Sequence, residues 1–236
     1  MAVPGNVGVV FVSHSARIAE GLVELARQMA PSAALVAAGG TDDGRIGTSF
    51  DLVNSGIAEA DRGDGVVVLC DLGSAILTAE TALDFLDDDT RDRVRIVDAP
   101  LVEGGVAAAV AAEAGEDLER VVAAAESARG ASAGADRAAV AEASAAVESS
   151  RGSHSRLVTL VNADGLHARP AAELVKLAST YPQKVTVNGT DAKSLLGIMS
   201  LGLTKGATVE IASDDPDGRV AVDAIAALAE SGFGEH

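Results

Sequence analysis

The stretch Val7-Gly8-Val9-Val10-Phe11-Val12-Ser13-His14-Ser15 is a run of β-branched and aromatic residues that ends in a polar turn. Such a run predicts a buried strand over 7–12. Apolar residues then recur at helical spacing from Ile18 to Met29, and Pro31 ends the pattern. The chain therefore begins with a predicted strand, a turn that carries His14, and a helix.

The alternation of strand and helix continues to about residue 97. Further strands are expected at 35–38, 66–70 and 94–97, and further helices at 50–58 and 76–86. This order indicates an α/β fold, a mainly parallel, doubly wound sheet with helices on both faces. Ligands of such sheets bind at the carboxyl ends of the strands. His14 and Asp71 each follow a strand end, so we expect them to share a crevice.

Composition divides the chain into two parts. All four lysines lie after residue 153, whereas the preceding part contains arginine but no lysine. An alanine-rich stretch begins at 106, after Gly104-Gly105, which we expect to permit close packing before a helix. Beyond about residue 130 little sequence remains that could form a core. We expect a domain over 1–130, a linker over 131–153 and a second domain over 154–236.

The second domain is predicted to be a small α+β open-faced sandwich. Strands are expected at 157–161, 184–189 and 207–212, and helices at 171–178, 194–201 and 221–228. With one further short strand near Asp191, the order becomes βαββαβα. This order collects the helices on one side of an antiparallel sheet.

Charge and cysteine content exclude several classes of function. The formal net charge of −17, with a sequence pI near 4.5, disfavours nonspecific binding to nucleic acid or to an anionic membrane. Cys70 is the single cysteine, which excludes an intrachain disulfide, and we expect it to be a small buried strand residue.

We find no signal peptide pattern and no apolar stretch of the ~18 residues needed to span a bilayer. We expect a cytoplasmic protein and propose neither a metal site nor a cofactor.

The octapeptide Gly165-Leu166-His167-Ala168-Arg169-Pro170-Ala171-Ala172 places an imidazole at the start of a predicted helix. Gly165 allows a tight turn, and Pro170 fits only the first turn of a helix. A phosphoryl group on His167 would meet the unpaired backbone N–H groups of that turn and the cationic Arg169. In an isolated pattern of this kind, a solvated histidine that caps the helix is the competing interpretation.

This octapeptide closely resembles the phosphorylation-site signature of HPr, the histidine-containing phosphocarrier of the bacterial sugar phosphotransferase system. The resemblance extends over 155–233. It implies that His167 accepts phosphate from phosphorylated enzyme I and that Arg169 stabilises it. The run from Lys193 to Gly202 is similar to the regulatory-serine helix of that family, and by this resemblance Ser194 aligns with the residue that a kinase modifies in some relatives. An N-cap role for Ser194 in the short helix is the structural alternative.

Four segments of the first domain occur in a recognisable order: Phe11–Ser15, Gly47-Thr48, Asp71–Ala75 and Ala99–Gly104. Over about 5–128 they resemble the enzyme IIA domain of the mannose class, and they are most similar to its version in phosphotransferase subunits of dihydroxyacetone kinase. In chemical terms, Asp71 would hold one ring nitrogen of His14 and Ser74 would donate to the phosphate. A strand-end turn and a helix cap are the structural alternatives for Asp71 and Ser74.

The two resemblances together imply a phosphohistidine relay. Phosphate would pass from enzyme I to His167, then to His14, and then to ADP on the nucleotide-binding subunit of dihydroxyacetone kinase. The resemblance also implies a homodimer through the first domain, so transfer within a chain and transfer between chains both stay open. Some relatives continue into an enzyme I-like segment that this chain lacks, so we expect an external donor that uses phosphoenolpyruvate.

Three alternatives to this relay stay open. The first is a mannose-class transport component that feeds a IIB protein. The second is a regulatory binding module controlled by phosphorylation. The third is a phosphatase with His14 as nucleophile, although the sequence shows neither an arginine cluster nor a general acid beside that histidine.

Overall fold

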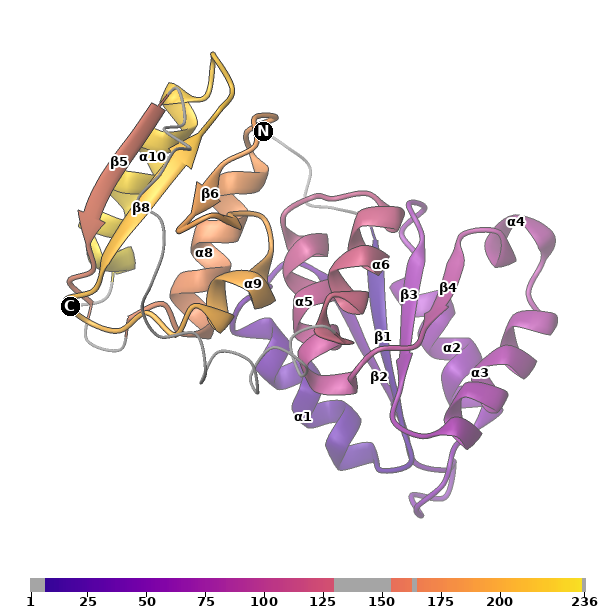
Figure 1. Ribbon diagram of the computed structural model, residues 1–236. Helices are drawn as coiled ribbons and strands as arrows, with labels where there is room; N and C mark the ends of the chain where they lie inside the picture. Colours follow the sequence, from indigo (N-terminus) through magenta and orange to yellow (C-terminus); the bar gives the residue numbers. More distant parts are fainter. Residues whose placement is uncertain (1–6, 130–153, 163–164, 235–236) are drawn as a thin grey trace. The chain divides into compact units, whose positions relative to one another are not determined.

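The computed structural model describes residues 7–129, 154–162 and 165–234 (Figure 1). The chain divides into two compact units, residues 1–129 and 130–236. The linker expected at 131–153 lies outside the described residues. In the part that the structure describes, no helix has both the length and the apolar character needed to cross a bilayer.

Strands and helices alternate along the first unit, and its sheet is entirely parallel. The strands are β1 (Gly8–Ser13), β2 (Ala34–Gly39), β3 (Val66–Cys70) and β4 (Val94–Val97). The helices are α1 (Ala16–Arg27), α2 (Phe50–Ala60), α3 (Gly73–Asp84), α4 (Asp88–Arg91), α5 (Leu101–Glu113) and α6 (Leu118–Glu126). Neighbouring strands pair in parallel in the order β2-β1-β3-β4. The predicted doubly wound α/β fold is confirmed.

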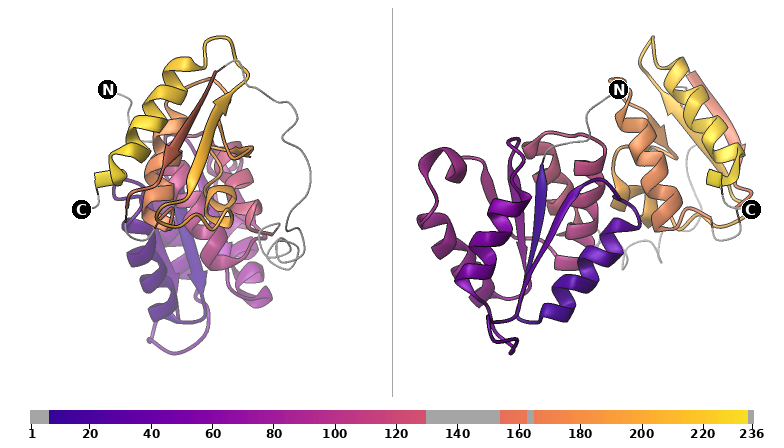
Figure 2. Two further views of the ribbon diagram at one scale, coloured as in Figure 1. Left: turned by 60° about the vertical axis from the view of Figure 1, so that its left-hand side comes forward. Right: turned by 180° about the vertical axis from the view of Figure 1, so that it is seen from behind.

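Two apolar cores lie on opposite faces of this sheet, because successive side chains of a strand point to opposite sides. On one face, Val9 and Phe11 of β1 pack with apolar residues of α1, α5 and α6. On the other face, Val10 and Val12 pack with α2 and α3. Figure 2 shows helices on both sides of the strands. The continuous apolar run of β1 is explained by this burial on both faces.

The two glycines at 104 and 105 bring α5 close to its neighbours. A Cβ atom at Gly105 would lie 2.3 Å from Cε1 of Phe11, and one at Gly104 would lie 2.9 Å from the Cβ atom of Ala99. The expected close packing is present. The glycines lie inside the helix rather than before it, however, because α5 begins directly after Pro100.

The second unit is an α+β sandwich with an antiparallel sheet. Its strands are β5 (His154–Thr159), β6 (Thr186–Val187), β7 (Thr190–Asp191) and β8 (Thr208–Ser213), and its helices are α8 (Ala168–Ser179), α9 (Leu195–Ser200) and α10 (Arg219–Glu230), followed by the 3₁₀ helix Gly232–Gly234. The sheet order is β5-β8-β6-β7, and α10 packs on β5 and β8. The predicted order βαββαβα, with its short strand near Asp191, is confirmed.

Several element boundaries differ from the sequence prediction, and three of the differences are explained by local structure. Strand β5 begins at His154, three residues early, because its register with β8 extends the ladder beyond the apolar residues. The strand expected at 184–189 is shortened because Asn188 and Gly189 have positive φ angles (49° and 81°) and form the turn into β7. Helix α3 begins at Gly73 instead of Ile76, since Leu72 is already its N-cap residue.

Candidate functional site

His14 lies at the carboxyl end of the parallel sheet, in the turn between β1 and α1. Strand β1 ends at Ser13, and Ser15 is the N-cap residue of α1. The neighbouring strand β3 ends at Cys70, and Asp71 follows it. Because β1 and β3 pair in parallel, both of these polar residues come to the same edge of the sheet.

The side chains of His14 and Asp71 are in direct contact. The Nδ1 atom of His14 lies 2.9 Å from Oδ1 of Asp71. The other carboxylate oxygen, Oδ2, accepts two hydrogen bonds of 2.8 Å, one from the backbone N–H of His14 and one from the hydroxyl of Ser13. The segment that carries the histidine therefore holds the carboxylate at both of its oxygens.

The environment of Asp71 favours its ionised form. Burial works to raise the pKa of Asp71, but the hydrogen bonds from the backbone and ring of His14 and from Ser13 outweigh it, so this pKa lies below its ordinary value. An ionised carboxylate only accepts hydrogen bonds. The proton of a neutral His14 ring is therefore assigned to Nδ1, and the nucleophilic lone pair to Nε2.

The Nε2 atom of His14 lies 2.7 Å from the hydroxyl of Ser74 in the first turn of α3. With the proton on Nδ1, the Ser74 hydroxyl is the donor. Ser74 is exposed, and the His14 side chain keeps 21% of its surface accessible. Ser74 is not the helix cap that the sequence left open, because Leu72 holds that position. The second ring nitrogen thus lies beside an exposed residue.

The loop before α2 contacts the same site. The backbone N–H of Gly47 donates to the carbonyl oxygen of His14 at 2.9 Å. The hydroxyls of Thr48 and Thr78 lie 2.8 Å apart, which ties this loop to α3. Ser49 is the N-cap residue of α2, and its side chain accepts a backbone N–H of the first turn. The loop therefore supports the backbone of His14 and the helix that carries its hydroxyl partner.

His167 is the N-cap residue of α8, and its side chain is exposed. Its carbonyl oxygen accepts the N–H of Ala171 at 3.0 Å. Gly165 has a φ angle of +66°, and a Cβ atom there would lie 2.1 Å from the carbonyl oxygen of Leu203, so this turn requires glycine. Arg169 is exposed in the first turn of α8. The imidazole and the guanidinium therefore both stand at a helix N-terminus, where an anion is favoured.

Ser194 is the N-cap residue of α9. Its hydroxyl accepts the N–H of Gly197 at 3.2 Å. This is the structural alternative that the sequence left open, and it accounts for a serine at this position. Modification of Ser194 by a kinase stays a prediction.

Cys70 ends β3, beside the His14 site, and is partly buried. Burial raises the pKa of its thiol to about 12, and the charges of Asp71 and Glu80 act in the same direction. The thiol is therefore protonated at neutral pH and a poor nucleophile. Across residues 7–129, 154–162 and 165–234, no group of three or more His, Cys, Asp or Glu side chains is placed to hold a metal ion.

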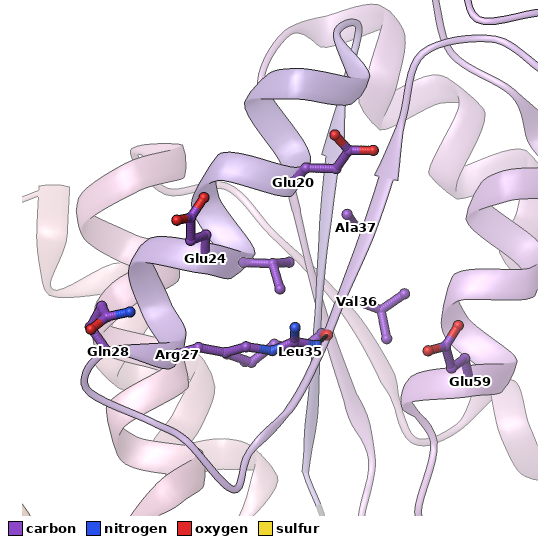
Figure 3. Close-up of a pocket in the computed structure, with 9 residues that line it drawn as sticks. Glu20, Glu24, Arg27, Gln28, Leu35, Val36, Ala37 and Glu59 are labelled. Carbon is purple, nitrogen blue, oxygen red and sulfur yellow. Dashed lines mark hydrogen bonds between the residues drawn. The ribbon is translucent and has the colours of Figure 1, made fainter.

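A groove of about 440 Å³ lies between α1 and the edge strand β2 (Figure 3). Its charged lining consists of Glu20, Glu24 and Arg27 of α1 and Glu59 of α2. None of the residues that contact His14 or that form the turn at His167 lines it. The groove therefore plays no part in the environment of either histidine.

Two residues of the His14 site were missed by sequence reasoning, namely Ser13 and Thr78. A serine stands on each side of His14, and the sequence does not show which of them turns inward. In the structure Ser13 is fully buried against Asp71, whereas Ser15 makes no side-chain capping bond. An alternation of buried and exposed residues along β1 would have been the signal, but every residue of this strand is buried.

Comparison with known proteins gives a family for each unit. The family model of the PTS system fructose IIA component matches residues 8–122, and that of the PTS HPr component phosphorylation site matches residues 154–231. A relative from Listeria innocua, PEP-dependent dihydroxyacetone kinase 2, phosphoryl donor subunit DhaM, is 44% identical over 105 residues, which cover 44% of this chain and 84% of that protein. The chain belongs to the DhaM family.

One further relative matches nearly the whole chain, and another matches only a third of it. The DhaM protein of Klebsiella michiganensis is 39% identical over 241 residues, covering 97% of this chain and 51% of that protein. The phosphocarrier protein HPr of Cupriavidus necator is 43% identical over 84 residues, covering 34% of this chain and 94% of that protein. The chain thus spans about half the length of the longer DhaM relatives that it matches.

Proposed function

We propose that this chain is a phosphohistidine relay subunit. Phosphate passes from enzyme I to His167, then to His14, and finally to ADP bound to the nucleotide-binding subunit of dihydroxyacetone kinase. The arrangement at His14 carries the proposal: Asp71 holds Nδ1 at 2.9 Å, while Nε2 faces the surface beside Ser74 at 2.7 Å. This is how an imidazole is prepared to act as a nucleophile.

The boundaries of the proposed parts follow the sequence. The enzyme IIA-like domain spans 1–130, a linker spans 131–153, and the HPr-like domain spans 154–236. We propose a homodimer through the first domain, in line with the resemblance to the enzyme IIA class. The single cysteine fits the reducing cytoplasm, where we expect the relay to operate.

The first transfer places the phosphoryl group on His167. At the N-terminus of α8 the group meets the backbone N–H groups of the first turn and the positive end of the helix dipole, which contributes about 0.3–1 kcal/mol. The exposed Arg169 adds charge-assisted hydrogen bonds to the phosphoryl oxygens. Exposure of His167 leaves it accessible to a donor protein.

The second transfer is an in-line displacement between two imidazoles. The lone pair on Nε2 of His14 forms a bond to phosphorus as the bond from phosphorus to the His167 ring breaks. His167 leaves as a neutral imidazole that keeps the proton on its other nitrogen. His14 keeps the proton on Nδ1, so its ring becomes cationic and Asp71 balances that charge. The Ser74 hydroxyl turns from Nε2 to a phosphoryl oxygen.

The third transfer removes the group from His14. The bond from phosphorus to Nε2 breaks as a terminal phosphate oxygen of ADP forms a bond to phosphorus, and ATP results. The His14 ring returns to its neutral form with the proton on Nδ1. Ser74, which lies beside Nε2, is exposed, and a partner needs such access to reach the phosphorus.

Labelling tests the relay directly. The chain is incubated with enzyme I, Mg²⁺ and phosphoenolpyruvate labelled in its phosphate, and the acid-labile label is mapped. We expect label on both His14 and His167 of the wild type, on His167 alone in His14→Ala, and on neither in His167→Ala. His154→Ala is the matched control, because His154 is a histidine that belongs to neither proposed site and its ring bonds to the carbonyl oxygen of Pro216. Label that stays on His167 in the wild type would contradict the relay.

A mixture of the two variants separates transfer within a chain from transfer between chains. His14→Ala retains the first station, and His167→Ala retains the second. Label that reaches His14 in the mixture shows exchange between chains. Its absence there, with both stations labelled in the wild type, shows transfer within a chain.

A further inference from the structure

The hydroxyl of Ser13 is a buried link between two parts of the His14 turn. Its Oγ atom donates to Oδ2 of Asp71 at 2.8 Å and accepts the backbone N–H of Ser15 at 3.1 Å. Ser13 has no exposed surface. Because an N–H can only donate and an ionised carboxylate can only accept, the hydroxyl proton must point to Asp71.

This bond controls the orientation of the carboxylate. The last side-chain torsion of an aspartate is soft, so a carboxylate with one partner can rotate. Oδ2 of Asp71 has two donors, the hydroxyl of Ser13 and the backbone N–H of His14. With Oδ2 held from two directions, Oδ1 points at Nδ1 of His14.

The hydroxyl is not a helix cap in the ordinary sense. The N–H that it accepts belongs to Ser15, the N-cap residue, rather than to the first turns of α1. The side chains that cap α2, α4 and α6 each accept the backbone N–H of the residue three positions onward, as Ser49 does. The buried hydroxyl of Ser13 therefore fixes the turn at Ser15 and the carboxylate of Asp71, and it does not cap the helix.

We propose that Ser13 is a positioning residue for phosphoryl transfer at His14, whose buried hydroxyl locks Asp71 in the orientation that keeps the ring proton on Nδ1. The assignment rests on the proposed phosphorylation of His14. The tautomer of the unphosphorylated ring can be measured independently of that step. Without the hydroxyl, Oδ2 keeps one donor and the ring populates both tautomers. The tautomer with the proton on Nε2 has no lone pair there to attack phosphorus.

The experiment compares Ser13→Ala with Ser13→Thr in the full chain. The readouts are the ¹⁵N signals of the His14 ring at neutral pH without phosphate, and the rate at which label passes from His167 to His14. For Ser13→Ala we expect a shift toward mixed tautomers and a loss of rate of about tenfold, the lower end for removal of a supporting hydrogen bond. Ser13→Thr keeps the hydroxyl and should recover both. Ser15→Ala is the matched control, since the Ser15 side chain makes no capping bond.

Two outcomes overturn the assignment. One is a Ser13→Ala chain with wild-type ring signals and a wild-type rate. The other is a wild-type ring without its proton on Nδ1. If Ser13→Ala does not fold, Ser13→Cys replaces it, because a thiol is of similar size and a weak donor. If no label reaches His14 in the wild type, the proposed relay fails, and the ring signals still decide the role of Ser13.

Discussion

The Oδ1 atom of Asp71 lies 2.9 Å from Nδ1 of His14, although 57 positions separate the two residues in the chain. The pair forms because β1 and β3 are parallel neighbours whose carboxyl ends meet. Charge and hydrogen bonding then act together: the carboxylate is ionised, and one ring nitrogen contacts it while the other lies beside the exposed hydroxyl of Ser74. This division of roles between two nitrogens is the chemical basis of the site.

Asp71→Asn should slow the phosphorylation of His14. An amide can present its N–H₂ group to Nδ1, which drives the ring proton to Nε2 and removes the nucleophile. We expect a loss of about 10²- to 10⁴-fold in the rate at which label reaches His14, with the label on His167 unchanged. Time-resolved mapping of the acid-labile label measures both. Asp84→Asn, at an exposed position of α3, is the control and should behave as wild type.

The contribution of Asp71 to stability should depend on pH. Its pKa is lower in the folded chain than in the unfolded chain, so ionisation stabilises the fold above the ordinary carboxyl range, about pH 4. This contribution is lost as the pH falls through the folded pKa. The difference in free energy of unfolding between wild type and Asp71→Asn should shrink as the pH falls below about 4. Urea unfolding followed by circular dichroism checks this, and a difference that grows in acid would contradict it.

Gly105→Ala should destabilise the first unit. A Cβ atom there would lie 2.3 Å from Cε1 of Phe11, which is fully buried, so α5 or the ring must move. We expect a loss of about 1–3 kcal/mol in the free energy of unfolding. Gly21→Ala is a matched change in α1, where a Cβ atom meets nothing within 4 Å, and it should stabilise by about 0.5–1 kcal/mol. Equal effects of the two changes in a urea titration would show that the contact with Phe11 does not matter.

Gly165→Ala should impair the His167 station and spare the His14 station. The added Cβ atom would lie 2.1 Å from the carbonyl oxygen of Leu203, and the φ angle of +66° is unfavourable for alanine. We expect slower labelling of His167 by enzyme I, whereas a separate phosphorylated HPr that docks at the first unit should still label His14. Gly189 also has a positive φ angle (+81°), but a Cβ atom there would meet nothing within 4 Å. Gly189→Ala therefore measures the effect of backbone strain without a steric clash. Normal labelling of His167 in Gly165→Ala would count against the proposed turn geometry.

Element types were predictable because their signals are local. The apolar run before His14 and the helical spacing after it identify β1 and α1, and the Pro170 position identifies the start of α8. Boundaries were less predictable. Strand β5 starts early because His154 pairs with Ser213 of β8, a partner that lies far along the chain. Positive φ angles at Asn188 and Gly189 shorten β6 through turn geometry.

The amino-acid sequence by itself determined the two fold classes, the order of the elements and the two candidate histidines, because periodicity and short motifs act within one or two turns of chain. Only the tertiary structure decided how the groups around His14 are arranged: the buried hydroxyl of Ser13 donates to Asp71, both oxygens of Asp71 contact His14, and the exposed hydroxyl of Ser74 lies beside Nε2. The physical reason is that a hydrogen bond depends on direction and on distances of a few tenths of an ångström. Those quantities are set where separate strand ends meet, and no local pattern encodes them.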